Sequence, residues 1–244
     1  MVKHPCIIVQ ARMNSERLPG KVMRPLGGRP LIGILLERLQ QSGLPLLLAS
    51  SVHPENDILI DYVRSLGVQT FRGSEDNVLE RYYLAAQSCG ADVVIRATGD
   101  NPLMDGKLIA DAYQRYLELD NERCYLSIGM SKTFPLGISA SVFSFALLEE
   151  AYRNASLPGH FEHVTPYIST NVPGNIDLHL FASPKDRFAW RLTVDTERDF
   201  ELHRILIEQY ACDRLGIDEI IQVLDAHPEL AAINSDVVQK SWDQ

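Results

Sequence analysis

The sequence has no long hydrophobic run, and this limits where the protein can act. Its 244 residues hold nothing close to the roughly 20 apolar residues that a membrane-spanning helix needs. The first residues, Met1 to Pro5, also lack the apolar core of a secretory signal peptide. We therefore expect a cytoplasmic protein with no membrane partner.

Paired cysteines and an excess of positive charge are also missing. The four cysteines form no CxxC pair, which argues against a zinc ribbon or a thioredoxin-like motif, and we expect them to be reduced and partly buried. The net charge is -9, so the chain lacks the basic face on which generic nucleic-acid binding depends. An acidic protein can still bind a nucleotide if it gathers its positive charge in one cleft.

What the sequence does contain is an alternation of short apolar runs with segments of helical periodicity. Apolar residues make up 45% and charged residues 23%, as in ordinary soluble domains. We predict buried strands at residues 6–9, 46–50, 68–71 and 93–97, and helices at 29–39, 54–66, 74–90 and 105–119. This rhythm predicts an α/β fold with a mainly parallel sheet that is covered on both faces.

The pattern changes after residue 120, where short apolar runs mix with glycine and proline. We predict a helix at 145–154, a strand at 176–181, a last strand at 192–194, a helix at 197–210 and a helical segment from 216 to 244. The chain is thus expected to form one domain over residues 1–244, with a small α+β lobe inserted at 123–190.

The first strand leads into a basic loop between residues 10 and 24. One carboxylate, Glu16, stands there against four cationic side chains, Arg12, Arg17, Lys21 and Arg24. Open α/β sheets bind phosphates at such strand ends, and arginine and lysine are suited to phosphate oxygens. Asn14 and Ser15 would hold the turn. Each cation alone could belong to a solvated turn, but the group behind a buried strand predicts a phosphate site. The loop matches neither the GxxxxGK[ST] nor the GxGxxG phosphate-binding motif, so it does not indicate an ATPase or a dehydrogenase.

Two aspartates follow predicted strands farther along the chain. Asp100 comes after a sharp turn at Gly99, and Asp195 follows directly after the predicted strand at 192–194. Carboxylates at these strand ends could hold a divalent metal against a triphosphate. For Asp100 taken alone, a role as turn former is the better explanation. Thr196 and Asp199 have the spacing of a helix cap, and Arg191 is a candidate contact for a substrate anion.

Two further groups of polar residues have competing explanations. Capping of a helix by Ser74 explains the acidic residues after it, but not Arg72 and Arg81, which could both face the cleft. His160 and His163 have the i, i+3 spacing of metal ligands, yet no third ligand is evident. A packing or sugar-contact role is the better interpretation for His163.

Several of these segments resemble the sugar cytidylyltransferases, the family that includes the acylneuraminate and 3-deoxy-manno-octulosonate enzymes. The segment QARMNSERLPGK, at residues 10–21, is similar to the signature loop of that family, and the closest likeness is to its spore-coat polysaccharide biosynthesis branch. GDNPL at 99–103 resembles its GDxPL segment, VDT at 194–196 its second metal-binding motif, and EHVTPY at 162–167 a segment of its sugar lobe. The resemblance covers residues 7 to about 202.

The resemblance implies a three-layer, Rossmann-like nucleotide-diphospho-sugar transferase fold and a Mg²⁺-dependent reaction. In it, CMP would pass from CTP to an acidic sugar with release of pyrophosphate, for surface polysaccharide biosynthesis. It also implies that a homodimer forms through the inserted lobe. The catalytic residues would be Arg12, Lys21 and Asp100, the metal ligands Asp100 and Asp195, and the sugar contacts His163 and Arg191. The nucleotide would contact Ala11, Arg12, Asn14, Ser15, Arg17, Lys21, Arg72, Arg81, Thr98 and Asp100.

One segment departs from the family pattern. Related sequences tend to carry acidic residues at 135–141, where this chain has Leu136, Ser139 and Ser141. The departure bears on the identity of the acceptor, and it leaves open a non-catalytic homologue that binds a nucleotide or a partner protein. A second alternative is another metal-dependent sugar-nucleotide enzyme, such as a glycosyltransferase, although the DxD motif frequent in those enzymes is absent.

Overall fold

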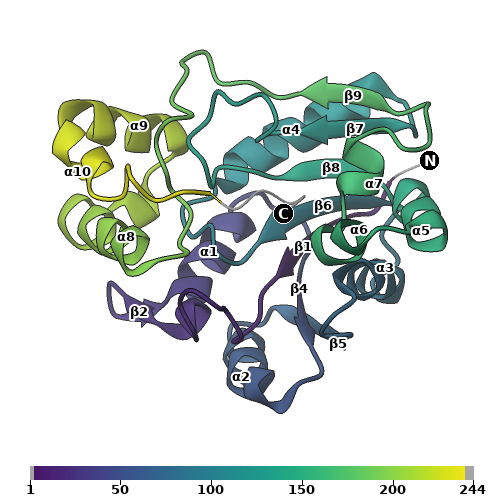
Figure 1. The fold of residues 1–244 in the computed structure, drawn as a ribbon, viewed down its shortest axis with the longest axis horizontal. Coiled ribbons are helices and arrows are strands. Elements are labelled where there is room, and N and C mark those ends of the chain that lie inside the picture. Colours follow the sequence, from purple (N-terminus) through teal and green to yellow (C-terminus); the bar gives the residue numbers. More distant parts are fainter. Residues whose placement is uncertain (1–2, 240–244) are drawn as a thin grey trace.

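A seven-stranded sheet runs through the centre of the protein, with helices on both faces (Figure 1). The structure, a computed structural model, describes residues 3–239. In spatial order the strands are β5 (Gln69–Gly73), β4 (Leu46–Ser51), β1 (Pro5–Gln10), β6 (Val93–Thr98), β8 (Ser141–Ser144), β7 (Cys124–Ser127) and β9 (Asp177–Leu180). Strands β5, β4, β1 and β6 are parallel, whereas β8 is antiparallel to both of its neighbours. The predicted α/β fold with a mainly parallel sheet is confirmed.

Strand β1 explains why the sheet needs a layer on each face. Successive side chains of a strand point to opposite faces, and here both sets are apolar. Ile7 and Val9 pack on one side and Cys6 and Ile8 on the other, each at most 3% exposed. The first face is covered by α1 (Leu31–Gln40), α2 (Asp57–Ser65), α4 (Gly106–Leu119), α8 (Glu197–Tyr210), α9 (Ile217–Ala226) and α10 (Pro228–Ala232). The second is covered by α3 (Val78–Ser88), α5 (Phe145–Asn154) and α7 (Pro166–Ser169).

Residues 123–190 continue the central sheet. They contribute β8, which pairs with β6, then β7 and finally the edge strand β9. They also form α5, α6 (Pro158–His163) and α7, which lie together near one end of the molecule (Figure 1). The predicted helix at 145–154 and strand at 176–181 are confirmed as α5 and β9.

The strand predicted at 192–194 does not form. Arg191 and Leu136 make an isolated bridge, in which the Leu192 amide donates to the Leu136 carbonyl oxygen at 2.6 Å. Two residues later the Val194 amide donates to the carbonyl oxygen of Asp100 at 2.8 Å. The segment changes partners before a ladder can develop, because it crosses from residue 136 to the turn after β6. It still delivers Asp195 to the end of the sheet.

The predicted helix boundaries were correct at some positions and wrong at others. Thr196 and Asp199 form the expected capping box at the start of α8. The third helix begins later than predicted, because Asn77 rather than Ser74 caps it and accepts from the Glu80 amide at 2.9 Å. The predicted helical segment at 216–244 ends at Ala232 with α10, and its last five residues lie outside the described part.

The described cysteines are all free, as predicted: Cys6, Cys124 and Cys212 are buried and Cys89 is partly exposed. Within residues 3–239, no helix combines the length and the apolar character required to cross a membrane.

A buried arginine joins three parts of the fold beneath the sheet end. Arg38 of α1 is 3% exposed, and its guanidinium donates to carbonyl oxygens on two sides. The acceptors belong to Leu103 and Met104 after β6, and to Cys212, Asp213 and Leu215 after α8. Hydrogen bonds from a charged donor are stronger than neutral ones. This one side chain therefore anchors the turn that carries Asp100.

We predict that Arg38→Met lowers the free energy of unfolding by about 3 kcal/mol or more, because several buried carbonyl oxygens lose their donor. Urea unfolding followed by circular dichroism would measure the loss. The control is Arg115→Met on the exposed face of α4, where Arg115 pairs with Glu118 and the change should stay within about 0.5 kcal/mol. A loss below about 1 kcal/mol for Arg38→Met would contradict the anchoring role.

Candidate functional site

A cleft with a volume of about 600 Å³ opens where β1 and β6 end. The two strands are parallel and paired from Pro5–Val93 to Gln10–Thr98, so their carboxyl ends meet at one edge of the sheet. Six of the predicted site residues line the cleft from the basic loop: Ala11, Arg12, Asn14, Ser15, Arg17 and Lys21. Later segments add five more, Arg81, Thr98, Asp100, His163 and Asp195.

A glycine allows the two strand ends to approach each other. The Gly99 amide donates to the carbonyl oxygen of Gln10 at 2.8 Å. A Cβ atom on Gly99 would lie 2.7 Å from the Cβ of Ala11 and 2.9 Å from the Gln10 oxygen. Any side chain here would force the turn away from the basic loop. Glycine at position 99 therefore brings Asp100 next to that loop.

Lys21 lies between the two predicted metal-binding aspartates. Its Nζ is 2.8 Å from Oδ1 of Asp195 and 3.5 Å from Oδ2 of Asp100, and it also donates to the carbonyl oxygen of Val194 at 2.7 Å. The ammonium group is nearly buried, so these contacts form with little competition from water. Three segments that are distant in the sequence thus meet at one cation.

Asp195 is surrounded by positive charge. Besides Lys21, Asp195 pairs with two arginines: its Oδ2 accepts from Nη2 of Arg191 at 2.7 Å and lies 2.9 Å from Nη2 of Arg17 in an ion pair. Burial alone raises the pKa of Asp195, but the charges of Lys21, Arg17 and Arg191 outweigh it, and the pKa lies below its ordinary value. Asp195 is therefore ionised at neutral pH.

Arg191 lies behind Asp195 and does not line the cleft. Its side chain is 5% exposed, and its Nε donates to Oδ1 of Asp199 at 2.8 Å. Asp199 also accepts from the backbone amides of Asp195 and Thr196 at 3.0 and 2.9 Å, so the cap of α8 fixes the loop that carries Asp195. The carboxylates of Asp195 and Asp199 already bind the Arg191 guanidinium. This geometry does not support the predicted contact of Arg191 with a sugar.

Thr98 and Asn101 orient the Asp100 carboxylate. Thr98 Oγ1 donates to Oδ1 of Asp100 at 2.7 Å, and Asn101 Nδ2 donates in turn to Thr98 Oγ1 at 2.8 Å. These bonds leave Oδ2 of Asp100 on the side of Lys21. Thr98, which was predicted to contact the nucleotide, thus also acts as a positioning residue.

The two arginines expected near the third strand differ in position. Arg81 is 1% exposed and lines the cleft, where it donates to the Ser74 carbonyl oxygen at 2.7 Å. Arg72 lies outside the cleft. Its guanidinium binds the carbonyl oxygens of residues 51, 52 and 53 and pairs with Asp57 at 2.6 Å, so it ties β5 to the turn after β4.

Some cleft residues were missed, among them Gln10, Arg96, Asn101, Ser139, Glu162 and Thr193. For Arg96 a signal was present, because a charged residue interrupts an apolar strand. Of the residues that depart from the family pattern, Leu136 and Ser139 line the cleft, whereas Ser141 is buried against the Tyr125 hydroxyl at 2.7 Å.

His163 lines the cleft at the end of α6, next to a strained turn. Val164 has φ of 68° and ψ of -55°, values of a γ-turn that is costly for a β-branched residue. The turn closes with a 2.7 Å hydrogen bond from the Thr165 amide to the His163 carbonyl oxygen. Burial lowers the pKa of His163, and Arg96 adds to this effect against the opposing charge of Glu162. The imidazole is therefore neutral at neutral pH.

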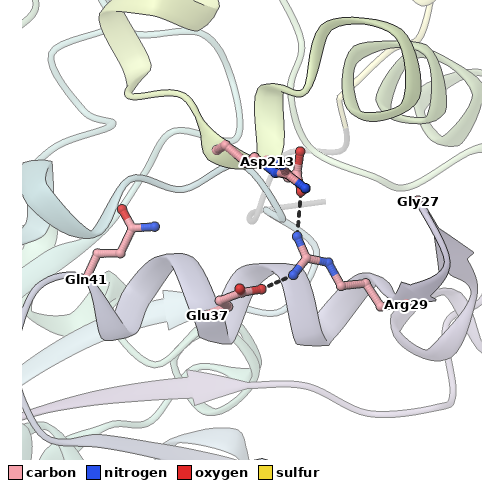
Figure 2. A pocket seen from close by; sticks show the side chains of 6 residues that line it. Gly27, Arg29, Glu37, Gln41 and Asp213 are labelled. Carbon is pink, nitrogen blue, oxygen red and sulfur yellow. Dashed lines mark hydrogen bonds and ion pairs between the residues drawn. The ribbon is translucent and has the colours of Figure 1, made fainter.

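A second hollow lies beside α1, and Figure 2 shows Arg29 in it between Glu37 and Asp213. Arg29 forms ion pairs with both carboxylates, and with one cation against two anions these three residues keep a net negative charge. None of the predicted site residues lines this hollow.

The two aspartates of the cleft fit a magnesium ion that is shared with a substrate. The described residues contain no group of three or more His, Cys, Asp or Glu side chains that could hold a metal by themselves. Mg²⁺ commonly uses one or two carboxylates together with waters and substrate phosphates. Asp100 and Asp195, which share the cation of Lys21, supply such a pair.

Comparison with known proteins identifies the family. The family model described as cytidylyltransferase matches residues 6–232. The chain belongs to the cytidylyltransferase family. Among its curated relatives, the uncharacterised protein MJ1063 of Methanocaldococcus jannaschii is 41% identical over 96% of both chains. The spore coat polysaccharide biosynthesis protein SpsF of Bacillus subtilis is 36% identical over 92% of this chain and 95% of its own.

A solved structure supports the same assignment. A cytidylyltransferase from Leptospira borgpetersenii superposes with a TM-score of 0.90 at 28% identity, over 98% of this chain and 100% of the other. The family and the spore-coat branch suggested by the sequence motifs are thereby confirmed. The expected Rossmann-like nucleotidyltransferase fold is confirmed as well.

We predict that Asp195→Asn makes the protein's stability less dependent on pH. Because the pKa of Asp195 in the folded protein lies below the ordinary 3.8, its ionised form adds stability above pH 3.8, and this contribution is lost as the pH falls below 3.8. The variant should therefore be less stable than the wild type at pH 7, by roughly 1–3 kcal/mol. The difference should shrink below pH 3.8.

Urea unfolding of both proteins, from about pH 7 down to about pH 3, tests this prediction. A difference in the free energy of unfolding that stays constant over the whole range would show that the cations around Asp195 do not stabilise its charged form.

Proposed function

We propose that this protein transfers CMP from CTP to an acidic sugar and releases pyrophosphate, for the synthesis of a surface polysaccharide. The observation that carries the proposal is the meeting of the basic loop with two carboxylates at the ends of β1 and β6, in a chain of the cytidylyltransferase family. Membership of this family supports the choice of CTP. The cytoplasm, where CTP is made, is the expected place for the reaction.

The basic loop would hold the triphosphate. Arg12, Arg17 and Lys21 line the cleft together, and their charges suit the β- and γ-phosphates, which become the leaving pyrophosphate. In the structure these cations pair with Glu75 and Asp195, and they would exchange part of those contacts for phosphate oxygens. Such positioning by charge is the main contribution that a protein makes to phosphoryl transfer.

Asp100 and Asp195 are the residues we propose for binding Mg²⁺. When bound, the ion would neutralise the negative charge that builds on the phosphate oxygens. Thr98 and Arg191 would keep the two carboxylates in place through the hydrogen bonds described above. A hydroxyl oxygen of the sugar would bond to the α-phosphorus, and the bond from that phosphorus to the pyrophosphate oxygen would break. The hydroxyl proton would pass to solvent water.

The acceptor sugar would lie at the side of the cleft formed by residues 136–139 and α6. His163 and Glu162 line this side and offer a neutral imidazole and a carboxylate to sugar hydroxyls. We also propose that the protein forms a homodimer through residues 123–190. The support is the edge strand β9, whose Leu178 and Leu180 are 44% and 51% exposed.

Pyrophosphate release from CTP and Mg²⁺, with a panel of acidic and neutral sugars, tests the proposed function. We expect release with an acidic sugar and, in Asp100→Asn, a loss of turnover of at least about 100-fold, because charge on the phosphates is no longer neutralised. Asp111→Asn, on the exposed face of α4, is the matched control and should keep full turnover. Near wild-type turnover in Asp100→Asn would show that the metal assignment is wrong. If the wild-type protein releases no pyrophosphate with any sugar of the panel, the non-catalytic binding homologue is favoured.

A further inference from the structure

Arg96 is a charged residue in the interior of a buried strand. It lies on β6, in register with Ile8 of β1 on one side and Ser141 of β8 on the other, and its side chain lines the cleft. Removing a charge from water is costly unless partners replace the water. We therefore expect Arg96 to have a binding partner that offsets this cost.

The guanidinium of Arg96 has donors to spare. Its Nη2 donates to Oε1 of Gln10 at 3.0 Å, whereas its Nε is buried and has no hydrogen-bond partner. Among the described residues, Arg96 has no carboxylate within ion-pair distance, unlike Arg12, Arg17 and Lys21 in the same cleft. Its guanidinium carbon lies 5.9 Å from the centre of the Tyr82 ring. Within residues 3–239 Arg96 thus has no anionic partner, and its Nε has no acceptor.

The position of Arg96 separates it from the arginines at the nucleotide side. Arg12 and Arg81 are tied to residues 74 and 75, in the loop between β5 and α3. Arg96 is instead in register with Ser141 of β8, just after residues 136–139, and it lines the same cleft as Ser139 and His163. His163 and Arg96 therefore face the side of the cleft that we assigned to the acceptor, and the neutral imidazole there leaves the arginine as the source of positive charge.

We propose that Arg96 binds the carboxylate of the acceptor sugar and thereby selects acidic over neutral sugars, an inference that rests on the proposed function. The planar fork of a guanidinium matches the two oxygens of a carboxylate. Gln10 accepts from Nη2, and the buried Nε gains an acceptor when the side chain turns toward the bound carboxylate. Glu162, across the same side, is left for sugar hydroxyls.

The test combines two substitutions with matched acceptors. Pyrophosphate release gives the KM for 3-deoxy-manno-octulosonate and N-acetylneuraminate and for their neutral carboxamides, and calorimetric titration gives the Kd of CTP with Mg²⁺. Arg96→Gln should raise the KM for the acid about 10- to 100-fold, as expected for a lost hydrogen bond to a charged group, with the Kd of CTP unchanged. Arg96→Lys should recover part of the loss.

The matched comparison is Arg81→Lys, which should show the reverse pattern, a weaker Kd for CTP and an unchanged KM for the acid. Arg115→Gln, on the surface of α4, should change neither quantity. For the carboxamides, wild type and Arg96→Gln should perform alike, because neither pairs the guanidinium with a carboxylate. A merely structural role for Arg96 would instead lower activity with acid and carboxamide equally.

Three results would overturn the inference: a wild type that uses the carboxamide as well as the acid, an Arg96→Gln variant whose defect lies in the Kd of CTP, or a wild type that binds CTP but uses none of the acids. Failure of the proposed function would look different, because the wild-type protein would then neither bind CTP with Mg²⁺ nor release pyrophosphate.

Discussion

The ion pairs of Lys21 with Asp100 and Asp195 are the interaction on which the site depends. They join the loop after β1, the turn after β6 and the segment before α8, which are far apart in the sequence. Opposite charges in a nearly buried place attract strongly, so the three segments hold one another in a fixed relation. The same charges are those that a nucleoside triphosphate and its metal ion would engage. The contacts that complete the fold at this edge of the sheet are thus also the parts of the proposed catalytic centre.

Charges that are withdrawn from water need support, and the surrounding structure provides it. Asp199 caps α8, binds Arg191 and holds the backbone of Asp195, so a helix start becomes a base for the site. On the other strand end, Gly99 permits the close approach to Ala11 that a side chain would prevent. Arg38 anchors the chain after Asp100 from below. Each of these three features acts locally, and together they place the cleft residues within reach of one ligand.

The sequence predicted the parallel strands β5, β4, β1 and β6 and the edge strand β9, because buried strands leave strong local patterns. It did not predict β7 and β8, which lie where short apolar runs mix with glycine and proline. It also predicted the basic loop and Asp100, since parallel strands place their ends at one edge. Side-chain direction was harder: Arg72 and Arg81 look alike in the sequence, but Arg72 turns to backbone carbonyl groups and Arg81 to the cleft. Arg191 was expected at the substrate and lies behind Asp195, because Asp199 binds it. Arg96 was missed, although a charge inside an apolar strand is a detectable signal.

The most direct measurement is the thermal unfolding midpoint with CTP, UTP, ATP and GTP, each with and without Mg²⁺. A ligand that binds only the folded protein, at about 100 times its Kd, adds roughly 2.7 kcal/mol of stability. The account predicts a raised midpoint with CTP that depends on Mg²⁺, and little change with the other nucleotides. An unchanged midpoint with every nucleotide would contradict it, because the cleft between β1 and β6 would then not be a nucleotide site.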